Sequence, residues 1–290
     1  MKQSLIQLHI SVLLAGFTGV LGVLIQLNEL PLVWYRMGIT FITLLLILII
    51  QKQKLELGFR KIMLLLSIGI LIALHWVFFY ASIKFANVSI GLVCFAATSL
   101  FTALLEPLLN STPWRKAELL LGILSLLGIY IIFQFDIRYR TGILFGLGSA
   151  IIAALFSVLN KKNIATAPPQ TIMLFEMGGG FLFLTCLLPA YIVHFPDAKW
   201  IPSLTDVFWL LILAWFCTVL AMELMLKALH NVSAFTQNLT LNLEPVYGIL
   251  LAFLVFHENR YLQNTFYVGM ACIALSVGIQ MRRIVNGRSY

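Results

Sequence analysis

A glutamate and a proline interrupt a long apolar stretch, "TLNLEPVYGILLAF" at 240–253. An ionisable group at the bilayer centre costs about 2.5–3.5 kcal/mol on insertion scales, so it normally faces protein or a wet cavity. Glu244 falls near the middle of this stretch, and Pro245 breaks the helix there because it lacks a backbone donor and frees a carbonyl. Asn238 and Asn242 share the same helix face. The pattern favours a cavity that binds a substrate or a proton, and a packing group at a structural kink is the open alternative.

Three more ionisable residues lie inside apolar stretches. The planar fork of Arg36 suits a substrate carboxylate, although snorkelling to the surface or a structural pair would also explain it. Histidine as a residue type titrates near neutral pH, so His75 could relay protons, or it could bond a neighbouring helix. Glu176 could hold a proton, and the three glycines that follow it indicate close helix packing. The candidates for proton coupling are therefore Glu244, Glu176 and His75.

Aromatic residues follow His75 in "LIALHWVFFYASIKF". Trp76 and Tyr80 could stack on a flat substrate, and an aromatic belt at the membrane interface is the competing interpretation. Glu106 and Glu223 fall near helix ends, where solvated side chains are expected. The predicted substrate or cavity residues are Arg36, His75, Trp76, Tyr80, Asn238, Asn242 and Glu244.

The composition says what must position these residues. The 290 residues are 61% hydrophobic and 10% charged, with a mean hydropathy of +0.99. Soluble domains carry about 25% charged residues, so lipid must be the solvent of this chain. Only helices and closed barrels satisfy every backbone group in lipid. Apolar runs of about twenty residues have the length of a spanning helix. An all-α integral membrane protein is expected.

Ten transmembrane helices are predicted. Their connections are short, so no soluble domain is inserted. The spans lie near 5–26, 32–50, 62–83, 88–109, 117–134, 142–160, 171–193, 206–226, 233–256 and 263–281.

The net charge of +8 sits between the apolar runs, which fits membrane topology better than a nucleic-acid surface. With a cytoplasmic N-terminus, every basic residue except Arg36 and five others falls on the inner side. Both termini are therefore expected in the cytoplasm, and no nucleic-acid partner is expected. The five basic residues on the predicted outer side are Lys84, Arg138, Arg140, Lys199 and Arg260.

Similar segments recur about 140–144 residues apart. "YRMGITFITLLLIL" from Tyr35 matches "FEMGGGFLFLTCLL" from Phe175, and "NVS" at Asn87 recurs at Asn231. Two repeats are predicted, at 1–137 and 138–290. Five helices is an odd number, so the second half would enter from the opposite side. Such an inverted-topology repeat is typical of secondary transporters, with the substrate site at mid-membrane between the halves.

These features resemble the drug/metabolite transporter superfamily, in its EamA-like branch. "ELPLVWYRMG" and "NLEPVYGILLAFLVFHE" carry the resemblance most specifically, and it covers essentially the whole chain. It implies a transporter of small metabolites such as amino acids, and drugs in some members, in a bacterial inner membrane. The chain departs from symmetry at the first-half counterpart of Pro245, where the register places Phe101, so Glu106 is not treated as the mate of Glu244.

No motif for another class of activity accompanies these features. The four cysteines lie in apolar segments without metal-like spacing, and no catalytic, phosphate-binding or metal motif is present. No cofactor and no metal are expected, and the protein is not expected to be an enzyme. Export of small metabolites by alternating access is the predicted function, with the lipid bilayer and the substrate as partners and a homodimer left open. Uptake is the alternative, and an intramembrane enzyme or a non-transporting scaffold are alternatives of other classes.

Overall fold

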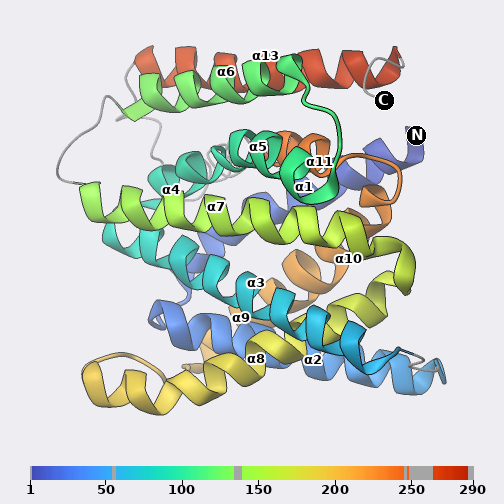
Figure 1. Cartoon of the computed structure of the whole chain (residues 1–290). Coiled ribbons are helices and arrows are strands. Elements are labelled where there is room, and N and C mark those ends of the chain that lie inside the picture. Colours follow the sequence, from blue (N-terminus) through green and yellow to red (C-terminus); the bar gives the residue numbers. More distant parts are fainter. Residues whose placement is uncertain (1, 54–56, 134–138, 245–246, 248–263, 287–290) are drawn as a thin grey trace.

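A computed structural model describes residues 2–53, 57–133, 139–244, 247 and 264–286, and within these ranges the regular structure is all helical (Figure 1). The first part of the chain forms α1 Lys2–Leu24, α2 Glu29–Ile50, α3 Phe59–Phe85, α4 Val88–Phe95, α5 Thr98–Asn110 and α6 Lys116–Phe133. The second part forms α7 Arg140–Asn163, the 3-10 turn η2 Ile164–Thr166, α8 Pro169–His194, α9 Leu204–Ala214, the π-helical turn η3 Trp215–Leu220, α10 Ala221–Leu229, α11 Ala234–Leu241 and α13 Asn264–Val285.

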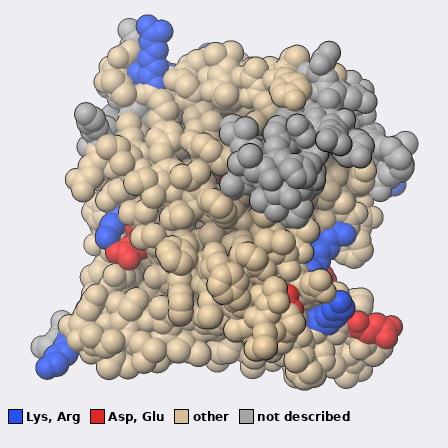
Figure 2. All heavy atoms as spheres, turned by 180° about the vertical axis from the view of Figure 1, so that it is seen from behind, with Lys and Arg blue, Asp and Glu red and all other residues tan. Residues whose placement is uncertain are grey.

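The protein is a membrane protein with several apolar helices. Six helical segments of the described ranges are long and apolar enough to cross a bilayer. Figure 2 shows a face that is mostly uncharged, with Lys, Arg, Asp and Glu side chains chiefly near its margins. Every predicted span contains helix, but 233–256 is described only in part, so the count of ten stays a prediction. The six segments are Gln3–Leu24, Glu29–Ile50, Phe59–Phe85, Arg140–Thr166, Pro169–His194 and Leu204–Leu229.

The predicted span at 88–109 is broken in the structure between α4 and α5. Two hydroxyls bond the carbonyls at the break: Thr98 Oγ1 donates to the Phe95 carbonyl at 2.5 Å and Ser99 Oγ to the Ala96 carbonyl at 3.1 Å. Side chains of this kind compete with the regular helix by bonding nearby backbone groups. The break therefore needs no proline, which is why the apolar pattern alone did not predict it.

Helices of one half of the chain pack against helices of the other half. Helix α3 packs against α7 and α8, while α10, its counterpart in the repeat, packs against α1. Helix α2 pairs with its counterpart α8, and α6 lies beside its counterpart α13 (Figure 1). This is the pairing that a two-fold relation between the halves produces, and it brings residues from both halves to the centre.

Glycines bring α8 to within backbone contact of α3. A Cβ at Gly69 would lie 1.9 Å from the carbonyl oxygen of Glu176, and one at Gly179 would lie 2.3 Å from the carbonyl oxygen of Leu66. Small residues allow such approach between membrane helices. We call this α3–α8 contact, with Gly69 and Gly179 at its centre, the glycine seam.

Gly69→Ala should destabilise the protein by about 1–3 kcal/mol, because the added methyl must push two backbones apart. Gly278→Ala is the matched control, since a Cβ at Gly278 has no atom of the described residues within 4 Å and alanine favours helix. Thermal unfolding in detergent measures both variants. Equal melting temperatures for Gly69→Ala and wild type would show that the seam is not tightly packed.

Candidate functional site

The guanidinium of Arg36 is held inside the protein by groups from α3 and η3. Its Nε donates to Thr218 Oγ1 at 2.8 Å, one Nη to Tyr80 Oη at 3.1 Å and the other Nη to the Cys217 carbonyl at 3.3 Å. Its central carbon lies 3.7 Å from the centroid of the Trp76 ring, a cation–π contact. Arg36 is only 2% exposed. It is therefore anchored within the protein, and it does not snorkel.

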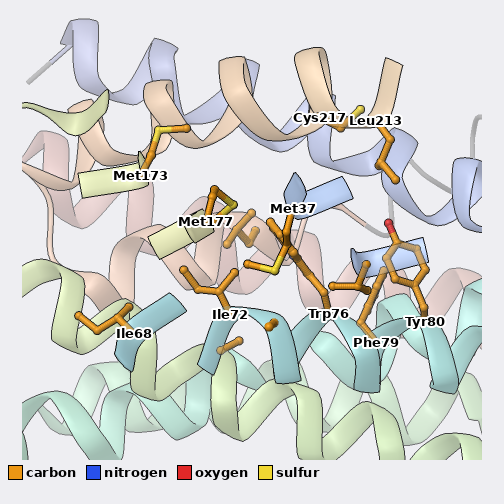
Figure 3. Close-up of a cluster of buried hydrophobic side chains, with 14 of the residues drawn as sticks. Met37, Ile68, Ile72, Trp76, Phe79, Tyr80, Met173, Met177, Leu213 and Cys217 are labelled. Carbon is orange, nitrogen blue, oxygen red and sulfur yellow. The ribbon is translucent and has the colours of Figure 1, made fainter. Parts of the chain in front are cut away.

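The turn η3 supplies two of these partners. It is a π-helical turn within the segment from α9 to α10, a rare form often found at functional sites. Thr218 Oγ1 donates to the Leu213 carbonyl at 2.8 Å, so the hydroxyl that accepts from Arg36 is itself fixed. Figure 3 shows Cys217 and Leu213 on the opposite side of the cluster from Trp76, Phe79 and Tyr80.

Arg36 borders a central cavity of about 90 Å³. Helix α3 contributes His75, Trp76 and Phe79 to its wall, and the second half of the chain contributes Ser157, Met222 and Glu244. The wall is mostly apolar with a few polar groups, as in small-molecule sites.

Glu244 lies in the same cavity as Arg36. It is 4% exposed, and the charge of Arg36 acts on it. None of the ion pairs between described residues joins the two side chains directly. The cavity therefore presents one buried cation and one buried carboxyl that are not consumed by pairing with each other.

His75 and Asn238 also line the cavity, and both are fixed by hydrogen bonds. His75 Nδ1 lies 2.8 Å from Ser149 Oγ, and this hydroxyl lies 3.0 Å from the His75 carbonyl. Asn238 donates to Thr102 Oγ1 at 2.7 Å and accepts from Ser157 Oγ at 3.1 Å. The bond to a neighbouring helix expected as one interpretation of His75 is present, and it leaves the ring in the cavity wall.

Two predicted cavity residues lie behind the wall. Tyr80 is fully buried and serves as an acceptor for Arg36. The amide of Asn242 lies 3.0 Å from Ser99 Oγ and 3.1 Å from Ser125 Oγ, and with its oxygen toward these hydroxyls its nitrogen donates to the Ala96 carbonyl at the α4–α5 break. Asn242 thus ties the segment that follows α11 to the break between α4 and α5.

The aromatic-belt interpretation of α3 is wrong for Trp76 and Tyr80. Trp76 is 8% exposed, and Figure 3 shows both rings within the buried cluster. Both side chains are buried in the core and contact Arg36, so neither lies at the membrane interface.

The solvated role expected of Glu106 is also wrong. Its carboxylate is buried and accepts from the backbone amides of Ala234 at 3.1 Å and Phe235 at 2.9 Å. It therefore caps the N-terminus of α11, where free amides and the helix dipole favour negative charge. Glu223 behaves as expected of a residue at a helix end, and it pairs with Lys227 at 2.5 Å.

The remaining candidates lie elsewhere. Glu176 is buried beside the glycine seam and does not line the cavity. Pro245, the predicted helix break, lies outside the described residues.

Sequence reasoning missed Thr218, Ser149 and Ser157, because a hydroxyl in an apolar span gives no periodic signal. The π-helical turn that places Thr218 has no sequence signature either.

The described part of the chain is thus an all-helical membrane protein with a buried cavity formed by both halves, whose mostly apolar wall carries a few polar groups. The chain belongs to the EamA-like transporter family, whose model matches residues 3–134 and again 140–279. Membership places it among transporters of the drug/metabolite type. A crystal structure of another protein shares the fold, with 14% identity, a TM-score of 0.75, and coverage of 95% of this chain and 96% of that one. No curated protein matches the chain.

Proposed function

We propose that this transporter moves small zwitterionic metabolites, such as amino acids, out of a bacterial cell across the inner membrane. The observation that carries the proposal is that a cation, Arg36, and a carboxyl, Glu244, border one buried cavity, and none of the ion pairs between described residues joins them. A zwitterion brings a carboxylate and an ammonium. It would satisfy both protein charges at once, which a neutral drug or a simple anion would not.

The surroundings of the two charges support separate tasks for them. Arg36 is stacked on Trp76 and held in one orientation by three hydrogen bonds. Its other N–H groups remain to bind a substrate carboxylate. Glu244 suits the ammonium. Phe79 and Met222 give the wall an apolar part against which the rest of the substrate would pack.

Alternating access requires that the cavity open to each side in turn. Exchanged packing between the halves supports an inverted-topology repeat of two five-helix units, and the charge distribution supports cytoplasmic termini. Rocking of one half against the other would then expose the cavity to either side. Uptake by the same machinery is the alternative direction.

The rival from another class is an intramembrane enzyme. It would need an acid and a base in contact, and His75 instead bonds Ser149, with no bond to Glu244 among the described contacts. This arrangement favours binding over catalysis.

Thermal stabilisation by matched ligands tests the proposal. An α-amino acid that fits the site should raise the melting temperature, because a ligand at a hundredfold excess over its Kd adds about 2.7 kcal/mol of stability. The controls are the same side chain without the amine and without the carboxylate, and each should stabilise less. Equal stabilisation by the decarboxylated amine would refute a role for Arg36 as the carboxylate partner, and no response to any zwitterion would refute the substrate class.

A further inference from the structure

Glu176 is a buried carboxyl without a hydrogen-bond partner among the described residues. It is 0% exposed, and neither of its side-chain oxygens has a described donor within bonding geometry. Its polar neighbour is the amide of Asn160 on α7, whose own Oδ1 also lacks a partner. Buried polar groups are nearly always hydrogen-bonded, so two unpartnered groups side by side call for an explanation.

No charge of a described residue compensates Glu176. A buried ionised carboxylate without a cation is costly by several kcal/mol, and such groups neutralise instead. Among the described residues of the helices around it, no charged or titratable side chain interacts with Glu176. The charged and titratable side chains of these helices are Glu29, Tyr35 and Arg36 on α2, Arg60, Lys61, His75, Tyr80 and Lys84 on α3, Arg140, Lys161 and Lys162 on α7, and Glu223 and Lys227 on α10.

We propose that Glu176 is the proton-binding site of this transporter, holding a proton in the conformation described and pairing through it with Asn160. The acid O–H donates to Asn160 Oδ1, and the amide N–H donates to the carboxyl C=O. This exchange satisfies the unpartnered oxygens on both side chains. The inference rests on the proposed transport function, and it assigns the coupled proton to a site apart from the substrate cavity.

A line of polar side chains along α7 joins this site to one end of the molecule. Asn163, one turn beyond Asn160, accepts from Lys61 Nζ at 2.5 Å. Ser157, one turn before Asn160, lines the cavity. Residues three apart lie on the same helix face. Water that enters where α3 begins and α7 ends, the end predicted to be cytoplasmic, would meet Asn163 first and then the Glu176–Asn160 pair.

The position of Glu176 couples its proton to helix movement. Its own backbone carbonyl oxygen is the atom that a Cβ at Gly69 would strike at 1.9 Å, so the carboxyl belongs to the residue whose backbone forms the tightest contact of the glycine seam. Loss of the proton to water leaves a carboxylate that must be hydrated, and hydration requires the seam to loosen. Protonation closes it again. The carboxyl thereby links proton release to the separation of α8 from α3.

The charge state can be measured without a substrate. Infrared difference spectra of the purified protein in nanodiscs, titrated from about pH 5 to about pH 8, report the C=O stretch of a protonated carboxyl. A component of this band should persist at neutral pH in wild type and be lost in Glu176→Gln. Asn160→Leu should shift the same component, because it removes the hydrogen-bond partner. Glu223→Gln, which alters a carboxyl in an ion pair, should leave the band unchanged.

Three outcomes would overturn the assignment. A band that is unchanged in Glu176→Gln would show that this carboxyl is ionised. A component that is insensitive to Asn160→Leu would show that the two side chains do not pair. A component that disappears when sodium chloride is added at constant pH would show that the site takes Na⁺ in place of a proton. Glutamine keeps the shape and the pairing with Asn160, and the melting temperature verifies that Glu176→Gln is folded.

A second measurement connects the site to transport. In vesicles with an internal pH dye, an α-amino acid that stabilises wild type should move protons with it. Glu176→Gln should lose this proton movement and retain exchange of labelled for unlabelled amino acid. Proton movement by Glu176→Gln at the wild-type rate would refute the coupling role. Failure of wild type to move any amino acid would refute the transport proposal instead, and the infrared result would still stand or fall by itself.

Discussion

Arg36→Lys should lower kcat/KM for a zwitterionic substrate at least about 30-fold, equivalent to about 2 kcal/mol or more, the loss typical of truncating one partner of a buried charged contact. Lysine keeps the charge, but it cannot reproduce the three directed bonds to Thr218, Tyr80 and Cys217. It also lacks the planar fork that binds a carboxylate through two parallel bonds. Uptake of labelled amino acid into reconstituted vesicles gives the rate constant.

Tyr80→Phe is the matched control for the arginine. It removes one acceptor from the guanidinium and leaves the other two and the Trp76 contact in place, so a smaller loss is expected. Both variants should be checked for folding by their melting temperatures. Normal kcat/KM in a folded Arg36→Lys would make Arg36 a structural residue and would weaken the case for an amino-acid substrate.

Glu244→Gln should reduce transport of zwitterions by at least tenfold, or about 1.4 kcal/mol. The neutral amide cannot compensate the substrate's ammonium in a buried cavity. Compared with wild type, the Glu244→Gln variant should discriminate less between the amino acid and its deaminated analogue, because the analogue has no ammonium to compensate. Competition between an amino acid and its deaminated analogue, measured in the same vesicles, gives the change in selectivity.

The pH dependence of Glu244→Gln distinguishes two roles for this carboxyl. If Glu244 compensates the ammonium and Glu176 holds the coupled proton, transport by Glu244→Gln should be weak but should keep its dependence on pH. If Glu244 itself carries the proton, the pH dependence should vanish while substrate binding remains. Transport at two or more pH values, with Glu176→Gln measured beside it, separates the outcomes.

The apolar runs were enough to predict which parts of the described chain contain helix. Each predicted span contains helix because its length and hydrophobicity leave a chain in lipid no other way to satisfy its backbone. The cost of burying an ionisable group similarly made Arg36, His75 and Glu244 candidates, and all three reach one cavity. The length and hydrophobicity of a span, and an ionisable residue within it, are properties of one segment and can be seen directly in the sequence.

Other features depend on contacts between segments and could not be predicted in this way. The carboxylate of Glu106 caps α11, whose first residues lie 128 and 129 positions further along the chain, and no local pattern records that meeting. The lack of a described hydrogen-bond partner for Glu176 also depends on other segments, because it reflects that none of the helices around it places a donor near the carboxyl. The run of aromatic residues that follows His75 did not show whether the Tyr80 side chain lies in the protein interior or at the membrane interface.

The turn η3 makes the support of Arg36 depend on the number of residues in a helix as well as on their identity. A π-helical turn holds more residues than an α-helical one, so removal of one residue from Trp215–Leu220 would leave a continuous α-helix. Because the wide turn absorbs the additional residue, the residues beyond the deletion would keep nearly the same orientation relative to α9. Met222 and Met225 would stay in the cavity wall, whereas the turn that presents Thr218 Oγ1 and the Cys217 carbonyl to Arg36 would be lost. A change in chain length by one residue at this turn would therefore release the arginine while the rest of the binding surface stayed in place.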